Sequence, residues 1–316
     1  MKAAITGATG CIGRNLLEIL VQKKWEVIVL HRKGSDLSRL DELDVETMEV
    51  DLCREVPRLP HVLDVVFHCA GNVSHWKRDE EQQYIDNVVA TQSMVMASVK
   101  ARVNKFIFTS TGATHQLQDY SLIAQDKFFV PYIRTKKQAE RVVLESSLNS
   151  VILSPTICIG KYDWNNYSGI YNYIIKGGSL VFPNYMHFCH AKDVADAHLS
   201  AYYKGRNGSN YILTGPKVTW LEFFQEAARQ LGVPQPTRVT PQWMLKLIAA
   251  NMEAVSAFTG KTPLLTKEFL YLLRNYDFPS YEILKTSATL EYLSSDLDVM
   301  IADSIGWMRS ENLLEE

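Results

Sequence analysis

A tyrosine and a lysine that could transfer a proton together, Tyr132 and Lys136, lie four positions apart in the sequence. On a helix, residues i and i+4 share one face, so the phenol and the ammonium would point in the same direction. A tyrosine with its ordinary pKa of about 10 is a poor acid–base catalyst at neutral pH. A neighbouring ammonium stabilises the phenolate and lowers that pKa. The pair therefore predicts proton transfer to or from a substrate oxygen.

The spacing alone does not identify this pair, because Tyr281 and Lys285 have the same spacing. We interpret the second pair as part of a surface helix in a smaller C-terminal lobe. The first pair instead follows the apolar run 106–108, which ends in the hydroxyl residues Thr109, Ser110 and Thr111. Ligands of open α/β sheets bind at the carboxyl ends of the strands. A hydroxyl at this strand end is therefore expected to hold a substrate carbonyl near Tyr132.

A glycine-rich turn, Thr6 to Gly13, follows the first apolar run of the chain and precedes a helical pattern. In such a turn, Gly7 would permit a positive φ, and the absence of a Cβ at Gly10 would let backbone N–H groups approach a pyrophosphate. The last glycine, Gly13, would let the helix pack closely on the strand. The turn predicts a dinucleotide site, and the alternative is a tight turn that binds nothing.

The end of the second predicted strand indicates which dinucleotide binds. An acidic residue there would hold the ribose 2′-hydroxyl of NAD, but the segment 29–35 contains Arg32 and Lys33 and no acid. Because an arginine can pair with a 2′-phosphate through two parallel hydrogen bonds, the segment favours NADP(H) over NAD(H). Arg14, just after the turn, could add a second charge. The alternative is that both cations only solvate a loop.

Six short apolar runs predict strands that alternate with helical patterns. The runs are mostly continuous rather than alternating, which is typical of a parallel sheet buried on both faces. We predict an α/β fold, a Rossmann-type doubly wound parallel sheet with a smaller, mainly helical C-terminal substrate lobe. The predicted strands are Ala3–Ile5, Val27–Leu30, Thr47–Val50, Val65–Cys69, Lys105–Thr109 and Val151–Leu153.

The pattern changes after residue 160. We assign residues 1–160 to a dinucleotide-binding domain, with 188–206 packing back on it, and residues 161–187 and 207–316 to a substrate-binding lobe. In that lobe, Thr219 and Glu222 form a capping box, and Gly232 ends the helix that follows. A second helix begins after Thr240 and Pro241, and Gly260 ends it. A short strand, 211–213, lies before both. The aromatic segment 162–173 is expected either to line the substrate site or to pack the lobe together.

Composition excludes several function classes. The 316 residues carry 33 Lys and Arg and 35 Asp and Glu, a formal charge of −2, which argues against nucleic acid or an anionic membrane as a partner. No apolar run is long enough to span a membrane, and no signal peptide is expected. The five scattered cysteines fit a reducing, cytoplasmic compartment and predict no metal site.

Taken in order along the chain, these motifs resemble those of the extended short-chain dehydrogenase/reductase family, the NAD-dependent epimerase/dehydratase type, in its dihydroflavonol-reductase-like branch. The resemblance covers most of the chain. It rests on the segments 6–13, Asp51-Leu52, 68–71, 87–91, 154–157, 190–195 and 211–215, together with Thr111, Tyr132 and Lys136.

The resemblance implies a set of functional residues. Catalysis would fall to Thr111, Tyr132 and Lys136, with Asn87 supporting a water-mediated proton relay. Tyr132 would protonate the alkoxide formed by hydride transfer from NADPH, and Lys136 would lower the Tyr132 pKa and bind the nicotinamide ribose. The cofactor-binding residues would be Gly7, Thr9, Gly10, Cys11, Ile12, Gly13, Arg32, Asp51, Leu52, Cys69, Ala70, Gly71, Tyr132, Lys136, Pro155 and Ile157.

The function predicted from the sequence is an NADP-dependent oxidoreductase that reduces a ketone or aldehyde to an alcohol, similar to dihydroflavonol reductases and hydroxysteroid dehydrogenases. One alternative is a nucleotide-sugar epimerase or dehydratase on the same fold. Another is a non-catalytic NADP-binding regulator, although such relatives generally lose the Tyr–Lys pair. The resemblance also implies a homodimer formed through the helices around 92–100 and 135–147.

Overall fold

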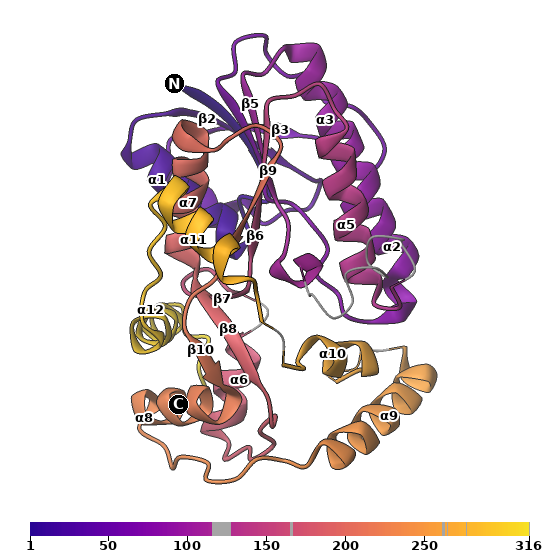
Figure 1. Cartoon of the computed structure of the whole chain (residues 1–316), viewed down its shortest axis with the longest axis vertical. Helices are drawn as coiled ribbons and strands as arrows, with labels where there is room; N and C mark the ends of the chain where they lie inside the picture. The colour runs from indigo at the N-terminus through magenta and orange to yellow at the C-terminus, as the bar shows by residue number, and fades with distance from the viewer. Residues whose placement is uncertain (116–127, 165–166, 261–262, 264, 276, 316) are drawn as a thin grey trace.

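A seven-stranded parallel sheet forms the centre of the larger domain in the computed structural model, in the order β3-β2-β1-β4-β5-β6-β9 (Figure 1). The structure describes residues 1–115, 128–164, 167–260, 263, 265–275 and 277–315. The strands of this sheet are β1 Lys2–Thr6, β2 Glu26–His31, β3 Glu46–Glu49, β4 Val65–His68, β5 Lys105–Thr109, β6 Ser150–Pro155 and β9 Ser209–Leu213.

Helices cover both faces of the sheet. Successive residues of a strand point to opposite faces, so each strand contributes apolar side chains to two separate clusters. Ala3 and Ile5 of β1 pack in the apolar cluster that includes Leu17 of α1. Ala4, between them, packs in the cluster of Met94 and Val143 on the opposite face. Figure 1 shows the first face covered by α1 Cys11–Gln22, α7 Ala191–Lys204 and α11 Ser280–Leu290, and the second by α2 Glu80–Tyr84, α3 Ala90–Ala101 and α5 Pro131–Leu144.

The sheet confirms the predicted α/β architecture and all six predicted strands, but the seventh strand is a correction. We expected residues 211–213 to belong to the smaller lobe. Instead β9 pairs in parallel with β6, with Tyr211 beside Leu153. The helix α11 packs on β9 and α7, so the residues from Ser280 also lie on the sheet domain rather than on the lobe where we placed Tyr281 and Lys285. Apolar runs indicate that a strand is buried, but they do not indicate which sheet buries it.

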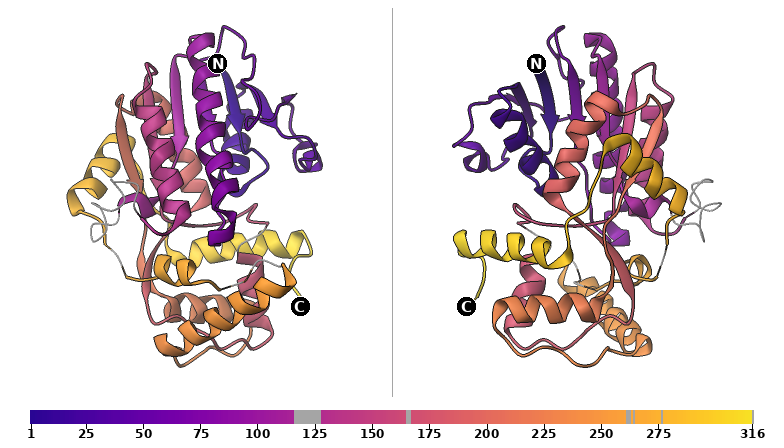
Figure 2. Two further views of the ribbon diagram at one scale, coloured as in Figure 1. Left: turned by 90° about the vertical axis from the view of Figure 1, so that its right-hand side faces the viewer. Right: turned by 60° about the vertical axis from the view of Figure 1, so that its left-hand side comes forward.

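The smaller lobe lies beyond the carboxyl ends of the central strands (Figure 2). It contains a three-stranded sheet in the order β10-β8-β7, in which β7 is parallel and β10 antiparallel to β8. Its core includes the buried rings of Phe188, Trp220, Phe223 and Trp307. The elements of the lobe are β7 Ile157–Ile159, α6 Tyr167–Ile175, β8 Tyr185–His190, β10 Lys217–Thr219, α8 Trp220–Leu231, α9 Gln242–Thr259, α10 Lys267–Leu272 and α12 Leu297–Ser310.

Helix ends in this lobe follow the predicted capping chemistry. The Glu222 backbone N–H donates to Thr219 Oγ1 at 3.1 Å, and the Thr219 N–H donates to the Glu222 carboxylate at 2.7 Å. Gly232 and Gly260 both end their helices with positive φ, at 74° and 69°.

Among the described residues, no helix is both long and apolar enough to cross a membrane.

Short helical segments complete the larger domain. The 3₁₀ segments are η1 Leu37–Leu40, η2 Lys77–Asp79 and η4 Gly112–His115. A five-residue π-helical turn, η3 Ile85–Val89, lies between α2 and α3 and carries Asn87. Turns of this type inside helices are rare and are frequent at functional sites.

Candidate active site

At two positions of the glycine turn between β1 and α1, Gly7 and Gly13, a side chain would not fit. Gly7 has a φ of 72°, and a Cβ there would lie 2.7 Å from the Ala70 backbone nitrogen. A Cβ on Gly13 would overlap the Gly7 carbonyl oxygen. Gly10, which precedes the first helical residue of α1, would meet only the Gly7 oxygen, at 3.4 Å. The crowding at Gly7 and Gly13 and the space beside Gly10 at the N-terminus of α1 fit the predicted dinucleotide turn.

A hydrogen-bonded network ties this turn to the end of β4. Thr6 Oγ1 lies 2.7 Å from His68 Nδ1 and accepts a hydrogen bond from the Ala70 N–H at 3.2 Å. His68 Nε2 contacts Thr91 Oγ1 at 3.1 Å, and burial lowers the pKa of His68 to about 3, so its ring is neutral. The segment Cys69–Gly71 consequently lies beside the glycine turn, and the structure brings these two predicted cofactor segments together.

The end of β2 is cationic, as the sequence indicates. The Arg32 side chain is 68 % exposed, and its guanidinium lies 3.7 Å from Asp86 Oδ1 on η3. Asp86 also accepts a hydrogen bond from the Asn72 amide at 2.9 Å. Asp51, which follows β3, accepts from the Cys53 N–H at 3.0 Å, and Leu52 is buried. An accessible arginine therefore stands where an acidic residue would select NAD.

Two other arginines lie near the glycine turn. Arg14, which the sequence analysis offers as a second charge for the cofactor, is buried, pairs with Glu18 at 3.4 Å and lies over the Tyr162 ring. Arg39, which the sequence analysis missed, donates to the Thr9 carbonyl oxygen at 3.3 Å and lies over Trp164. The only signal for Arg39 in the sequence was a basic residue shortly after β2. Its contact with the glycine turn arises only in the folded chain.

The proton-transfer candidates lie at the carboxyl ends of β5 and β6. Tyr132 is the second residue of α5, which begins with Pro131, and Lys136 is one turn further on. Lys136 is 5 % exposed, and its ammonium donates to the Thr109 carbonyl oxygen at 2.7 Å and lies 4.4 Å from the centre of the Phe108 ring. Burial lowers the pKa of Lys136 to about 8.

The Tyr132 phenol differs from the sequence expectation. Burial raises its pKa, and an interaction with the Thr111 hydroxyl opposes that rise. The lysine ammonium is held by the strand carbonyl of Thr109, so in this structure the partner that lowers the Tyr132 pKa is Thr111. The spacing of Tyr132 and Lys136 correctly predicts a shared helix face, but it does not specify which atom the ammonium contacts.

Asn87 links this cluster to the loop after β4. Its amide nitrogen donates to the Asn72 carbonyl oxygen at 3.0 Å and to Thr135 Oγ1 at 3.1 Å, and its oxygen accepts from the Asn72 N–H at 2.7 Å. A Cβ on Gly71 would lie 3.1 Å from the Asn87 oxygen and 3.6 Å from the Lys136 nitrogen. The loop therefore lies beside both Asn87 and Lys136 at Gly71, and the predicted catalytic residues converge at one edge of the sheet.

Two rings beside Tyr132 come from places that the sequence analysis did not consider. His75 meets the Tyr132 ring edge to face, with the centroids 5.6 Å apart, and stacks on Phe269 of α10 at 5.0 Å. Thr266 Oγ1 donates to the His75 carbonyl oxygen at 3.2 Å. Because these residues are almost two hundred positions apart, no local pattern predicts their contact.

Three rings of the aromatic segment 162–173 that the structure describes pack within the protein. Tyr162 contacts Trp307 and donates to Glu18, and Tyr171 is fully buried in the lobe core. Tyr173 accepts a hydrogen bond from the Leu180 N–H. Of the alternatives left open by the sequence, packing is correct for these three rings. Asn165, Asn166, the Tyr167 side chain and residues 116–127 lie outside what the structure describes.

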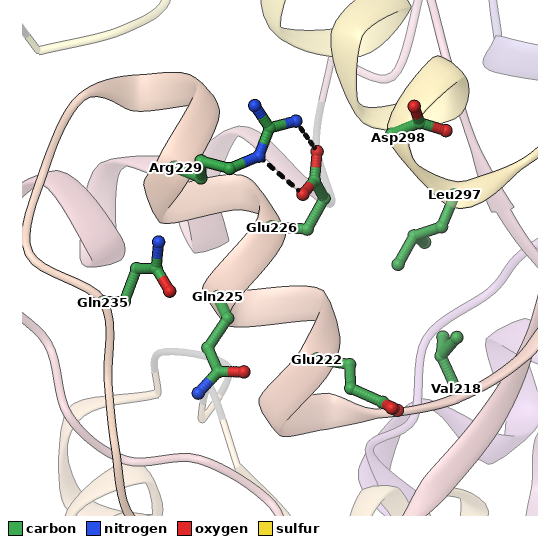
Figure 3. A pocket seen from close by; sticks show the side chains of 8 residues that line it. All are labelled: Val218, Glu222, Gln225, Glu226, Arg229, Gln235, Leu297 and Asp298. Atoms are coloured by element: carbon green, nitrogen blue, oxygen red, sulfur yellow. Dashed lines mark hydrogen bonds and ion pairs between the residues drawn. The ribbon is translucent and has the colours of Figure 1, made fainter.

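A surface hollow of about 410 Å³ lies between α8 and α12 of the smaller lobe (Figure 3). Its lining combines charged and polar side chains with Val218 and Leu297, and Arg229 donates to Glu226 within it. It contains none of the residues predicted to bind the cofactor or to act in catalysis. The predicted site and this hollow are therefore unrelated.

The parallel sheet, the bare glycine turn and the Tyr–Lys pair at the carboxyl edge define an NAD(P)-dependent enzyme of the dehydrogenase, reductase and epimerase class, which acts on CH–OH or carbonyl groups. The chain belongs to the NAD dependent epimerase/dehydratase family, whose sequence profile matches residues 3–213. The sequence-based assignment to the extended short-chain dehydrogenases/reductases is thereby confirmed.

Individual relatives are similar over nearly their whole length. A putative dihydroflavonol 4-reductase of Synechocystis sp. is 23 % identical over 98 % of this chain and 95 % of the relative. The crystal structure of gox2253 has a TM-score of 0.81 at 25 % identity and covers 99 % of both chains. A UDP-glucuronic acid 4-epimerase of Bacillus cereus, solved with UDP-glucuronic acid and NAD, has a TM-score of 0.75 at 17 % identity, over 98 % of this chain and all of that one.

Proposed function

We propose that this protein is an NADP-dependent reductase that converts a ketone or aldehyde into an alcohol. The observation that carries the proposal is the convergence of Tyr132, Thr111 and Lys136 at the sheet edge, combined with Arg32 in place of an acid at the end of β2. The first feature supplies proton transfer at a carbonyl oxygen. The second feature favours a dinucleotide with a 2′-phosphate.

The residues divide into those that hold the dinucleotide and those that act on the substrate. The backbone of residues 7–13 would bind the pyrophosphate, Asp51 and Leu52 would contact the adenine, and Cys69–Gly71 would lie along the nicotinamide-side ribose and phosphates. Pro155 and Ile157, at the end of β6 and the start of β7, would pass close to the nicotinamide. When bound, the reduced dinucleotide supplies the hydride.

Proton transfer would be carried by the chain's own side chains. Thr111 would hold the substrate carbonyl oxygen by a hydrogen bond, and Tyr132 would donate its phenolic proton to that oxygen. Lys136, one turn away, would hydrogen-bond the nicotinamide ribose. Asn87, which holds the Asn72 carbonyl oxygen next to this group, would position the water that returns a proton to Tyr132.

A carbonyl panel assayed by NADPH absorbance tests the reaction. Consumption of NADPH with ketones or aldehydes supports the proposal. NAD that stays bound through purification, with no net oxidation during turnover, would instead support a nucleotide-sugar epimerase, the class to which the Bacillus cereus neighbour belongs. NADPH binding without consumption of any carbonyl would support a non-catalytic regulator.

The cofactor preference has a separate test, which is measurement of the dissociation constants of NADP⁺ and NAD⁺. Charged hydrogen bonds contribute about 1.5–3 kcal/mol, so Arg32→Ala should weaken NADP⁺ binding by roughly 10- to 100-fold and leave NAD⁺ binding nearly unchanged. Arg206→Ala removes an exposed arginine after α7 and is the matched control. Equal or tighter binding of NAD⁺ by the unaltered protein would contradict the assignment.

We also propose a homodimer through α3 and α5. Three large apolar side chains on these helices are exposed, namely Met96, Val99 and Leu144. Burying them in a two-fold interface would remove apolar surface from water. Light scattering of the intact protein and of Met96→Glu tests this, because the substitution should yield monomers if the interface is correct.

A further inference from the structure

His75 is held against the catalytic candidates from two sides. Its ring meets the edge of Tyr132 on one side and stacks on Phe269 on the other, with an interplanar angle of 11°. Its backbone carbonyl oxygen accepts from Thr266, whose hydroxyl also accepts from the Phe269 N–H at 2.9 Å and so caps α10. The lobe therefore fixes the position of the His75 ring beside Tyr132.

One polar atom of this ring, Nδ1, is not used within the part of the protein that the structure describes. Nδ1 is fully buried, and it has no hydrogen-bond partner among the described residues. Leaving a buried polar group unpaired costs about 1–3 kcal/mol, and such groups in native structures call for an explanation. Packing alone would be served equally well by a phenylalanine, which has no polar atom to desolvate.

The chemistry of the ring limits what could pair with it. Burial lowers the pKa of His75 to about 4, so the imidazole is neutral at pH 7. A neutral imidazole offers one donor and one acceptor and no charge. It therefore suits a hydroxyl or a second carbonyl better than a carboxylate or a phosphate, and the adjoining Phe269 ring suits an apolar or aromatic body.

We propose that His75 is a substrate-binding residue that hydrogen-bonds a second, uncharged oxygen of a hydroxyketone or diketone whose reacting carbonyl meets Tyr132. The centroids of the His75 and Tyr132 rings are 5.6 Å apart, so both side chains lie within reach of one small substrate. The inference rests on the proposed reductase function and adds to it the class of substrate.

Two aromatic ketones that differ by one hydroxyl test this assignment, namely acetophenone and 2-hydroxyacetophenone. The unaltered protein should have the higher kcat/KM for the hydroxyketone. His75→Phe keeps the stack on Phe269 and should lower kcat/KM for 2-hydroxyacetophenone about tenfold or more, mainly through KM, while changing that for acetophenone less than about threefold. His75→Gln, which restores a donor and an acceptor, should recover part of the preference. His61→Phe, at an exposed position, is the matched control.

A binding measurement separates this inference from the proposed reaction. Each ketone is titrated by calorimetry into the NADP⁺-saturated protein and into the NADP⁺-saturated His75→Phe variant, which measures its affinity. A His75-dependent preference for the hydroxyketone without any NADPH consumption would support the site and overturn the reductase function. Equal losses for both ketones on His75→Phe, or no preference in the unaltered protein, would overturn the role of His75. Thermal unfolding of each variant checks that it is folded.

Discussion

The two Tyr-x-x-x-Lys pairs share a spacing and a helical setting but occupy opposite environments. On α5, the Tyr132 phenol is buried enough to have a raised pKa, and Lys136 is 5 % exposed. On α11, Tyr281 is 67 % exposed, and Lys285 donates to the Asn210 carbonyl oxygen at 3.2 Å and to Glu282. The spacing places two side chains on one face, and the position of the helix on the sheet decides whether that face can do chemistry.

The difference comes from where each helix begins. The first turn of α5 lies at the carboxyl end of β5, where Thr111 and the Thr109 carbonyl oxygen reach the pair. The helix α11 instead packs against α7 and β9, on the outside of the sheet domain. Three sets of experiments can break or sharpen this contrast, and a fourth tests the junction of the two lobes.

The largest effect is expected for the two tyrosines. Tyr132→Phe removes the proton donor and should lower the rate of NADPH oxidation by about 10²- to 10⁴-fold, the range that general acid catalysis contributes. Its dissociation constant for NADPH should change little. Tyr281→Phe should retain the activity of the unaltered protein. Equal activities of the two variants would remove Tyr132 from the mechanism.

The next largest difference is expected between substitutions of the two lysines, in dinucleotide binding. Lys136→Met removes a buried ammonium next to the Gly71 loop and should weaken dinucleotide binding by roughly 10- to 100-fold, the effect of losing a charged hydrogen bond. Lys285→Met should leave binding unchanged, since that ammonium contacts a carbonyl on the outer face. Fluorescence titration with NADPH measures both. Unchanged binding by Lys136→Met would place the dinucleotide elsewhere.

A pH titration sharpens the role of the Lys136 charge. Because burial lowers its pKa to about 8, Lys136 is protonated below pH 8 and becomes neutral above it. Dinucleotide affinity should therefore be highest below pH 8 and fall as the pH rises through that value. Lys136→Arg, which stays charged, should have a flatter profile above pH 8. A steep decline that persists in Lys136→Arg would assign it to another group.

The smallest expected effect concerns the junction of the two lobes. Burial opposes the charge on His190, but Asp193 of α7 and Asp303 of α12 outweigh it and raise the His190 pKa to about 9. The contribution of protonated His190 to the stability of the fold is complete below about pH 6.5, the pKa of histidine in the unfolded chain. It is lost as the pH rises through 9. We expect a loss on the order of 2 kcal/mol after allowance for solvent screening. Urea unfolding at pH 6 and pH 9.5 measures it, and His190→Asn should reduce the difference.

The sequence predicted the sheet and the residues at its edge because both depend on local chemistry. Continuous apolar runs indicate buried parallel strands, and a turn such as Gly7–Gly13 needs glycine whatever surrounds it. The placement of β9 and α11 in the larger domain was missed, since their patterns indicate burial but not a partner. The same limit applies to Arg39, His75 and Phe269, whose contacts join segments far apart in the chain.

The location of the Lys136 hydrogen bond shows a second limit. The spacing of two residues on a helix determines which face their side chains share. The hydrogen bond that a side chain makes depends instead on which acceptor lies nearest to it. Here that acceptor is the Thr109 carbonyl oxygen on β5. The role of each side chain in the site therefore required the folded arrangement of the strand, the helix and the loop after β4.

The path of the chain between the lobes has a consequence for how such a protein can change. After β6 the chain enters the smaller lobe at β7, returns through α7 and β9, leaves again at β10, returns at α11 and ends at α12. Neither lobe is a continuous stretch of sequence, so neither can be cut out, exchanged or expressed separately as one segment. New substrate preferences must therefore arise by exchanging side chains and loops within the intact polypeptide rather than by shuffling whole modules.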